Sequence, residues 1–287
     1  MPDIATRKVV DTNALQLPQL RAYLSESPSH FAVLTDYAAM ESYKGNTLVS
    51  IFRNMEVLAD FPKQVIILQS TGTVCGLRGN RAGLQQRMID DDQTRGFQIY
   101  CKALQLAKRG NASARQQLLE HGREADAHLK RILDDAMTMP DIIDEIASSF
   151  SQDELQIVRT GKPFSRSLID KVLKTVIDLT GSFYSTHPNV TFIPDADELT
   201  NTFLFRAALC SILWALDWIA VGGAKGVKPE KIRNDIVDVN FATFATFFDS
   251  LLSMDNKTIR IYLQALIVLE SMSGGRLIDG AVQGRPK

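Results

Sequence analysis

Four acidic residues far apart in the chain occupy positions from which carboxylates could act together, and the first of them is Asp11. The apolar pair Val9-Val10 precedes it and predicts a buried strand over residues 7–11, whose C-terminal end would present Asp11, Thr12 and Asn13. In open α/β sheets, ligands bind in the crevice beyond that end of the strands. An acid there is a natural ligand for a hard cation.

The remaining acids of interest are Glu41, on a predicted helix over residues 36–41, and two acids near the C-terminus. Asp238 lies on a predicted helix, and Asp255 follows a predicted short strand over residues 250–253. Two parallel strands would bring Asp11 and Asp255 to the same edge of a sheet. The helical acids would then lie over that edge.

Such a cluster of like charges is unfavourable unless a cation compensates it. Mg²⁺ or Mn²⁺ would remove the repulsion, because both are hard cations that prefer oxygen ligands. Divalent cations held by carboxylates, with water in the remaining positions, are suited to hydrolysis of phosphodiester bonds. The sequence therefore predicts a divalent-metal site of hydrolytic character.

At this point the chain resembles the PIN domain family of metal-dependent nucleases. The residues that carry the resemblance are Val10-Asp11-Thr12-Asn13, Glu41 on its helix, Asp238, and Ser253-Met254-Asp255. The resemblance implies a four-acid site made by Asp11, Glu41, Asp238 and Asp255, with Mg²⁺ or Mn²⁺ as the cofactor. It also implies endonucleolytic cleavage, usually of RNA.

Several assignments in this pattern stay open. Asp235 and Asp249 are extra acids close to the third and fourth positions and serve as reserve candidates. Asp235 could instead be a helix acid favoured by the dipole, and Asp255 could be the cap of the last helix. The residues expected to support the site by orienting an acid or binding phosphate are Thr12, Asn13 and Ser253.

The order of predicted elements indicates an α/β fold with a parallel sheet that is discontinuous in sequence. A PIN-like three-layer nuclease domain is expected to combine residues 1–75 and 225–275, with residues 76–224 as a large helical insertion. Residues 276–287 are expected to form a flexible tail. In the first predicted helices, Asp36 is the expected N-cap.

Bulk properties exclude few functions. The net charge of −1 gives no global basic field, although residues 78–131 carry an excess of Lys and Arg that could contact nucleic acid or simply be solvated. Three widely spaced cysteines argue against a disulfide framework and for a reducing compartment. The apolar stretch 203–221 contains Arg206 and Asp217, which favours a buried helix over a membrane span. With no signal peptide recognised, a cytoplasmic location is expected.

The leading hypothesis is a metal-dependent endoribonuclease, for which a toxin or defence role would be one use. One alternative is a catalytically inactive PIN-like module that binds RNA or a protein. Another is a structure-specific DNA nuclease. RNA is the expected substrate, DNA is the less favoured one, no membrane is expected, and a homo-oligomer or a protein inhibitor is compatible with such an enzyme.

Overall fold

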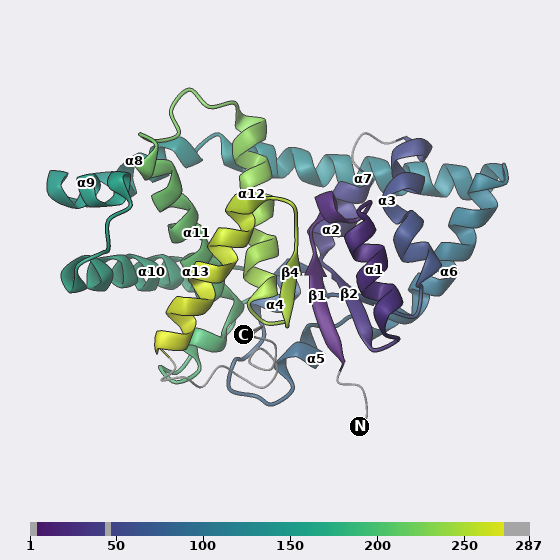
Figure 1. Cartoon of the computed structure of the whole chain (residues 1–287), viewed down its shortest axis with the longest axis horizontal. Helices are drawn as coiled ribbons and strands as arrows, with labels where there is room; N and C mark the ends of the chain where they lie inside the picture. The colour runs from purple at the N-terminus through teal and green to yellow at the C-terminus, as the bar shows by residue number, and fades with distance from the viewer. Residues whose placement is uncertain (1–4, 44–46, 273–287) are drawn as a thin grey trace.

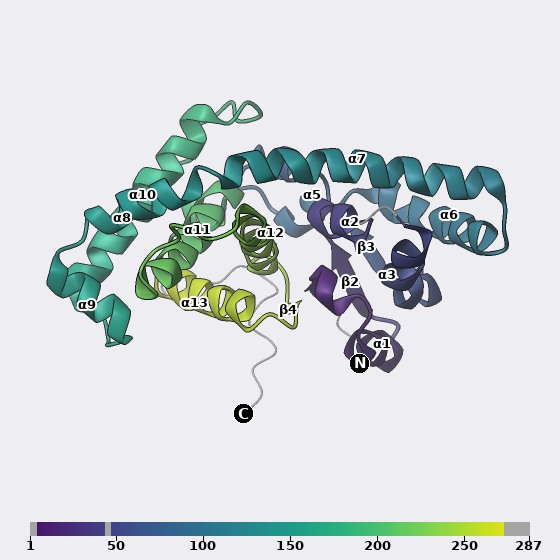
Figure 2. The same ribbon diagram turned by 90° about the horizontal axis from the view of Figure 1, so that it is seen from above.

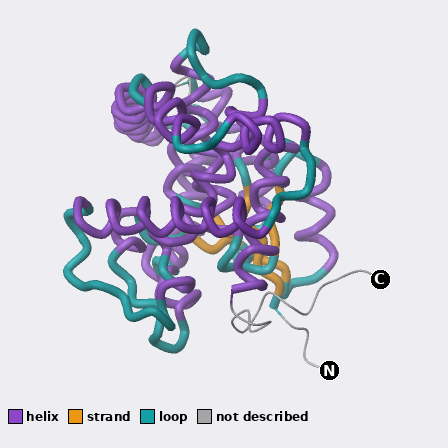
Figure 3. The backbone as a smooth tube through the Cα atoms, turned by 90° about the vertical axis from the view of Figure 1, so that its left-hand side faces the viewer, coloured by secondary structure: helices purple, strands orange, loops and turns teal. Residues whose placement is uncertain are grey.

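A four-stranded parallel sheet lies at the centre of the molecule, surrounded by helices (Figures 1 and 3). The computed structural model describes residues 5–43 and 47–272, so the predicted tail 276–287 lies outside the described residues. The strands are β1 (Thr6–Val10), β2 (His30–Leu34), β3 (Val65–Ile67) and β4 (Ser250–Leu252). The α/β class and the parallel sheet are therefore confirmed, and the architecture is compatible with a three-layer α/β fold.

The strand order, β3-β2-β1-β4, places the first and last strands of the sequence side by side. Val9 and Val10 are fully buried, as the apolar run predicts, and Val10 is in register with Leu252 of β4. From β1 the chain proceeds outward through β2 to β3, and it returns on the other side of β1 as β4. The direction of winding therefore reverses between β1 and β4.

The early helices follow the predicted pattern with one correction. They are α1 (Pro18–Glu26), α2 (Asp36–Ser42) and α3 (Leu48–Asp60). The N-cap of α2 is Thr35, whose hydroxyl accepts the Ala38 amide at 3.1 Å, and the prediction of Asp36 as the cap is wrong. Asp36 instead accepts the amide and hydroxyl of Thr71, at 2.7 and 2.8 Å, because the chain after β3 returns past α2.

The helical middle of the chain packs directly against the sheet. Leu68 pairs with Ile89 in an antiparallel bridge after β3, and one continuous apolar core includes side chains from the sheet and from the middle helices. The division at residues 76 and 224 stays a prediction. The middle helices are α4 (Thr71–Cys75), α5 (Leu84–Met88), α6 (Asp91–Lys108), α7 (Ala112–Ala136), α8 (Met139–Ser148), α9 (Gln152–Thr160), α10 (Arg166–Thr186) and α11 (Phe203–Ala220).

Helix α7 packs against helices from both the first and the last part of the chain. It contacts α2 and α6 from the first part of the chain and α12 (Pro229–Ala245) from the last part. Figure 2 shows it lying across the molecule from α6 to α8. It therefore packs on both helices that carry predicted site acids.

Helix α11 is apolar and long enough to cross a membrane by length and composition, yet 72% of it is buried inside the protein. It packs against α10, α12 and α13 (Asn256–Met272). The predicted burial of this stretch is confirmed. The phenylalanines of the C-terminal segment, Phe241, Phe244, Phe247 and Phe248, are buried in the same core.

Candidate functional site

Asp11 is the first residue beyond β1, and the sheet fixes its place. Its amide donates to the carbonyl of Leu252 in β4 at 2.9 Å, and the residue is only 2% exposed. Ser253 and Asp255 come just after β4, at the same edge of the sheet, because the two strands are parallel. The predicted meeting of the two strand ends is thus present.

The Asp11 carboxylate is oriented by two of the predicted supporting residues. Its Oδ2 accepts the Ser253 hydroxyl at 2.5 Å and the Asn13 side-chain amide at 2.6 Å. The Oδ1 of Asn13 in turn accepts the Met254 amide at 2.9 Å, which ties the end of β1 to the end of β4. The third supporting residue, Thr12, donates its hydroxyl to Oε2 of Glu41 at 2.9 Å, so α2 is joined to the same edge.

Asp255 is both a helix cap and a neighbour of Asp11. Its Oδ1 accepts the amides of Lys257 and Thr258, at 2.7 and 2.9 Å, in the first turn of α13. Its own amide donates to the Ser253 hydroxyl at 3.0 Å. The capping alternative is therefore correct for Oδ1, and the cap also holds the carboxyl near the end of β4.

The pKa of Asp238, on α12, is affected by all of the other predicted acids. Burial raises its pKa to about 8, and negative neighbours contribute in the same direction. Those neighbours are Asp11, Asp255, Asp235 and Glu41. Burial also raises the pKa of Asp11, with further contributions from Glu41 and Asp255. Asp11 and Asp238 thus each lie within electrostatic range of Glu41 and Asp255, and of each other, although the four acids come from four different segments.

The two reserve acids have other roles. Asp235 is buried, and its Oδ2 accepts the indole N–H groups of Trp214 and Trp218 at 3.0 Å each, while its Oδ1 pairs with Lys257. Asp249 precedes β4 and accepts the Arg7 amide at 2.7 Å, so it lies at the opposite end of the sheet. Both reserve carboxylates are thus engaged in contacts outside the four-acid set.

The donor set fits a divalent cation in its chemistry, because several carboxylates that repel one another are gathered at one sheet edge. The described carboxylates nevertheless lie farther apart than the ligands of one metal ion. Among residues 5–43 and 47–272, no group of three His, Cys, Asp or Glu side chains is close enough to share a metal ion. Carboxylate side chains would have to rotate for three of them to reach one cation.

The basic excess of residues 78–131 is partly used within the protein. Arg78 pairs with Glu198 at 2.6 Å, and Arg95 pairs with Asp92 at 2.5 Å. Arg115 donates to the carbonyl of Ala107 at 2.8 Å. These contacts favour the ordinary helical-surface interpretation for part of the predicted nucleic-acid contact.

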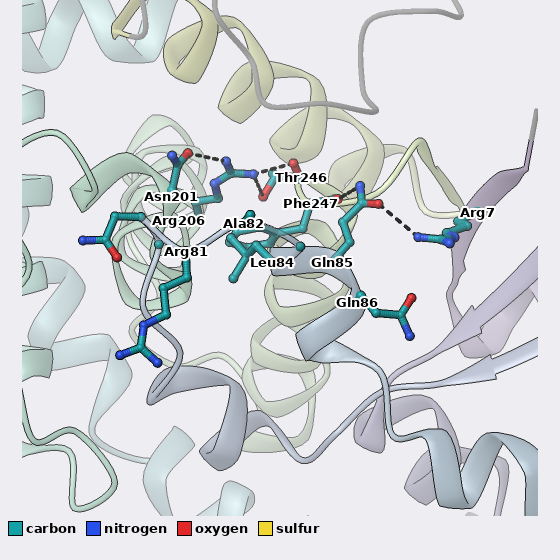
Figure 4. Close-up of a pocket in the computed structure, with 13 residues that line it drawn as sticks. Arg7, Arg81, Ala82, Leu84, Gln85, Gln86, Asn201, Arg206, Thr246 and Phe247 are labelled. Carbon is teal, nitrogen blue, oxygen red and sulfur yellow. Dashed lines mark hydrogen bonds between the residues drawn. The ribbon is translucent and has the colours of Figure 1, made fainter.

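A separate cavity of about 440 Å³ lies away from the acids, beside Arg7 and Phe247 (Figure 4). It is lined in part by Arg206, which is 2% exposed. The Arg206 guanidinium donates to the carbonyls of Thr246 and Thr200, at 2.5 and 2.8 Å. It lies 3.9 Å from the centroid of the Phe247 ring. Sequence reasoning treated Arg206 only as a charge that interrupts an apolar stretch.

Replacing Arg206 with leucine is expected to lower the free energy of unfolding by roughly 2–4 kcal/mol, because buried carbonyls lose their donor. Urea unfolding measures the change. Arg95→Leu is the control, since the Arg95 and Asp92 side chains are 72% and 93% exposed, and it should change stability by less than about 0.5 kcal/mol. Equal stability losses in both variants would contradict a structural role for Arg206.

Sequence reasoning did not identify the partners of Asp235. Trp214, Trp218 and Lys257 come from α11 and α13 and meet α12 only in the folded chain. The available signal was the position of Lys257 two residues after a predicted site acid.

No family model, no curated protein and no solved structure matches this chain, so its resemblance to PIN nucleases is carried by the motif residues.

Proposed function

We propose that this protein is a PIN-like, metal-dependent endoribonuclease whose site is formed by Asp11, Glu41, Asp238 and Asp255. The observation that carries the proposal is the position of these acids where β1 and β4 end side by side. The winding of the sheet reverses between these two strands, and such a switch point is where α/β proteins bind their ligands.

The residues of the chain have distinct parts in this proposal. Ser253 and Asn13 hold the Asp11 carboxylate in one orientation through three hydrogen bonds. Asp238, with a pKa raised to about 8, holds a proton near neutral pH until a cation compensates its neighbours. A divalent cation, when bound, supplies Lewis-acid stabilisation of phosphate charge and lowers the pKa of water.

The open arrangement of the carboxylates supports a second candidate, an inactive PIN-like module that binds RNA or a protein. The two candidates differ in their response to Mn²⁺. A functional site should bind Mn²⁺ with an increase in melting temperature, because the ion binds the folded state and relieves its repulsion. An inactive module should show no specific shift.

The decisive experiment incubates the purified chain with labelled single-stranded RNA, a folded tRNA and a DNA flap, each with Mn²⁺, with Mg²⁺ and with EDTA. Cleavage of RNA within the strand, dependent on the cation and absent with EDTA, is the expected result. Cleavage of the DNA flap alone would indicate the structure-specific DNA nuclease. No cleavage together with no thermal shift in Mn²⁺ would exclude the nuclease function.

A further inference from the structure

We infer that Lys257 is a phosphate-binding residue at the edge of the acid site, held there by Asp235. This inference rests on the proposed nuclease function for its substrate, RNA. The reserve acid Asp235 is a buried carboxylate with three donors: the indole N–H groups of Trp214 and Trp218, and the ammonium of Lys257.

The Asp235 carboxylate is a fixed anchor. Trp214 and Trp218 are four residues apart on α11, and both indole N–H groups bond the same oxygen at 3.0 Å. The other oxygen is left for the ammonium of Lys257, and the Asp235 side chain is only 7% exposed. Because the indoles prevent the carboxylate from rotating away, the ammonium is positioned rather than free to move with its flexible side chain.

The residue that carries this ammonium adjoins one of the four acids, Asp255. Lys257 is in the first turn of α13, and its amide donates to Asp255 Oδ1 at 2.7 Å. Asp235 is one helical turn before Asp238 on α12, and its charge raises the pKa of Asp238. Lys257 therefore connects the segment that carries Asp255 with the helix that carries Asp238.

A positive group at this place would reduce the repulsion between the carboxylates and a phosphate. A phosphodiester carries a negative charge and would be repelled by a cluster of carboxylates. An ammonium has three N–H donors, of which the pair with Asp235 occupies one, and the Lys257 side chain is 24% exposed. The remaining donors can reach a phosphate oxygen at the edge of the site, and lysine is suited to that contact as a point charge.

Lys231 provides a matched comparison. Its ammonium lies 5.1 Å from the centroid of the Trp218 ring, and that of Lys257 lies 5.8 Å from it. Both lysines thus carry the same charge over the same indole. Only Lys257 combines this contact with the carboxylate of Asp235 and the N-terminal turn that follows Asp255.

The test measures RNA binding without catalysis, by fluorescence anisotropy of a short single-stranded RNA in the Asp11→Asn background. Adding Lys257→Met should weaken binding about 5- to 10-fold and reduce the slope of log Kd against log salt by about one. Lys257→Arg should restore most of the affinity, and Lys231→Met should leave the dissociation constant within twofold. In the active enzyme, Lys257→Met should raise KM more than it lowers kcat.

A purely structural ion pair between α12 and α13 predicts a different pattern. Lys257→Met would then lower the unfolding midpoint while the affinity of the folded protein and its salt slope stay unchanged, and that outcome overturns the inference. Equal losses in the Lys231 and Lys257 variants would also overturn it. If the parent protein cleaves no RNA but Lys257→Met still weakens binding selectively, the nuclease function fails and the phosphate contact stands.

Discussion

Replacing Asp11 with asparagine is expected to reduce RNA cleavage by at least ~100-fold, because even residues that only orient a metal ligand contribute roughly 10- to 100-fold. The substitution would keep the size of the side chain but remove the charge that a cation needs. The free energy of unfolding should change by less than about 1 kcal/mol, because two effects offset each other. Asparagine accepts weaker hydrogen bonds from Ser253 and Asn13, but it removes the charge whose burial and repulsion raise the pKa of Asp11. Single-turnover cleavage and urea unfolding measure the two effects.

Asp249→Asn is the matched control for this experiment. Asp249 is an acid beside the same two strands, but it lies at their opposite end, where it accepts the Arg7 amide. Its substitution should leave the cleavage rate within about threefold of the wild type. Full activity of Asp11→Asn at saturating Mn²⁺, or a larger loss in Asp249→Asn, would refute the assignment of the site.

Asp238→Asn is expected to stabilise the protein at pH 8 in the absence of divalent cations, by roughly 3 kcal/mol after allowance for solvent screening. The reason is the pKa of Asp238, which burial and the surrounding acids raise from 3.8 to about 8. Ionising this carboxyl in the folded protein is unfavourable, because burial desolvates the charge and the neighbouring acids repel it. Asparagine removes that cost while retaining a polar side chain.

The sign of the pH dependence follows from proton counting. Between about pH 4 and pH 8 the folded protein binds a proton at Asp238 that the unfolded chain has already released. The unfolded state therefore binds fewer protons, and the contribution of this residue to stability falls as the pH rises through that window. Below pH 4 both states are protonated, and the contribution becomes constant.

Urea unfolding at pH 5 and pH 8, with EDTA present, measures this effect. The stability of the wild type minus that of Asp238→Asn should be more negative at pH 8, and Mn²⁺ should reduce the difference by binding the wild type. Substitution of the exposed Asp170, which pairs with Arg166 on α10, is the control, and it is unfolded at the same two pH values. A difference between wild type and variant that does not change with pH would contradict the raised pKa.

The sequence predicted the position of Asp11 because that position depends on local features. An apolar run followed by an acid defines a strand end, and the same reasoning placed Asp255 after β4. The parallel direction of β1 and β4 was expected, whereas their direct pairing is a finding of the structure. The α/β class was accessible for the same reason, since each strand contains a short apolar run with a recognisable boundary.

The contacts of Asp235 and Arg206 could not be predicted in this way. Each depends on side chains from other helices: two tryptophans and a lysine for Asp235, and the end of α12 for Arg206. Spacing identifies which residues share a helix face, but it does not specify which face of which helix they meet. For this reason the sequence left Asp235 and Asp238 as alternatives for the third acid, and the contacts of Asp235 with Trp214, Trp218 and Lys257 could not enter that choice.

The pairing of β1 with β4 has a consequence for when the protein can act. The hydrogen bond from Ser253 to Asp11 joins residues 242 positions apart, so a growing chain contains Asp11 long before its partner has been made. Contacts of such separation form late, because loop closure must be completed first. Under the proposed function, the emerging polypeptide would be unable to cut RNA, including the message that encodes it, until synthesis has passed residue 255.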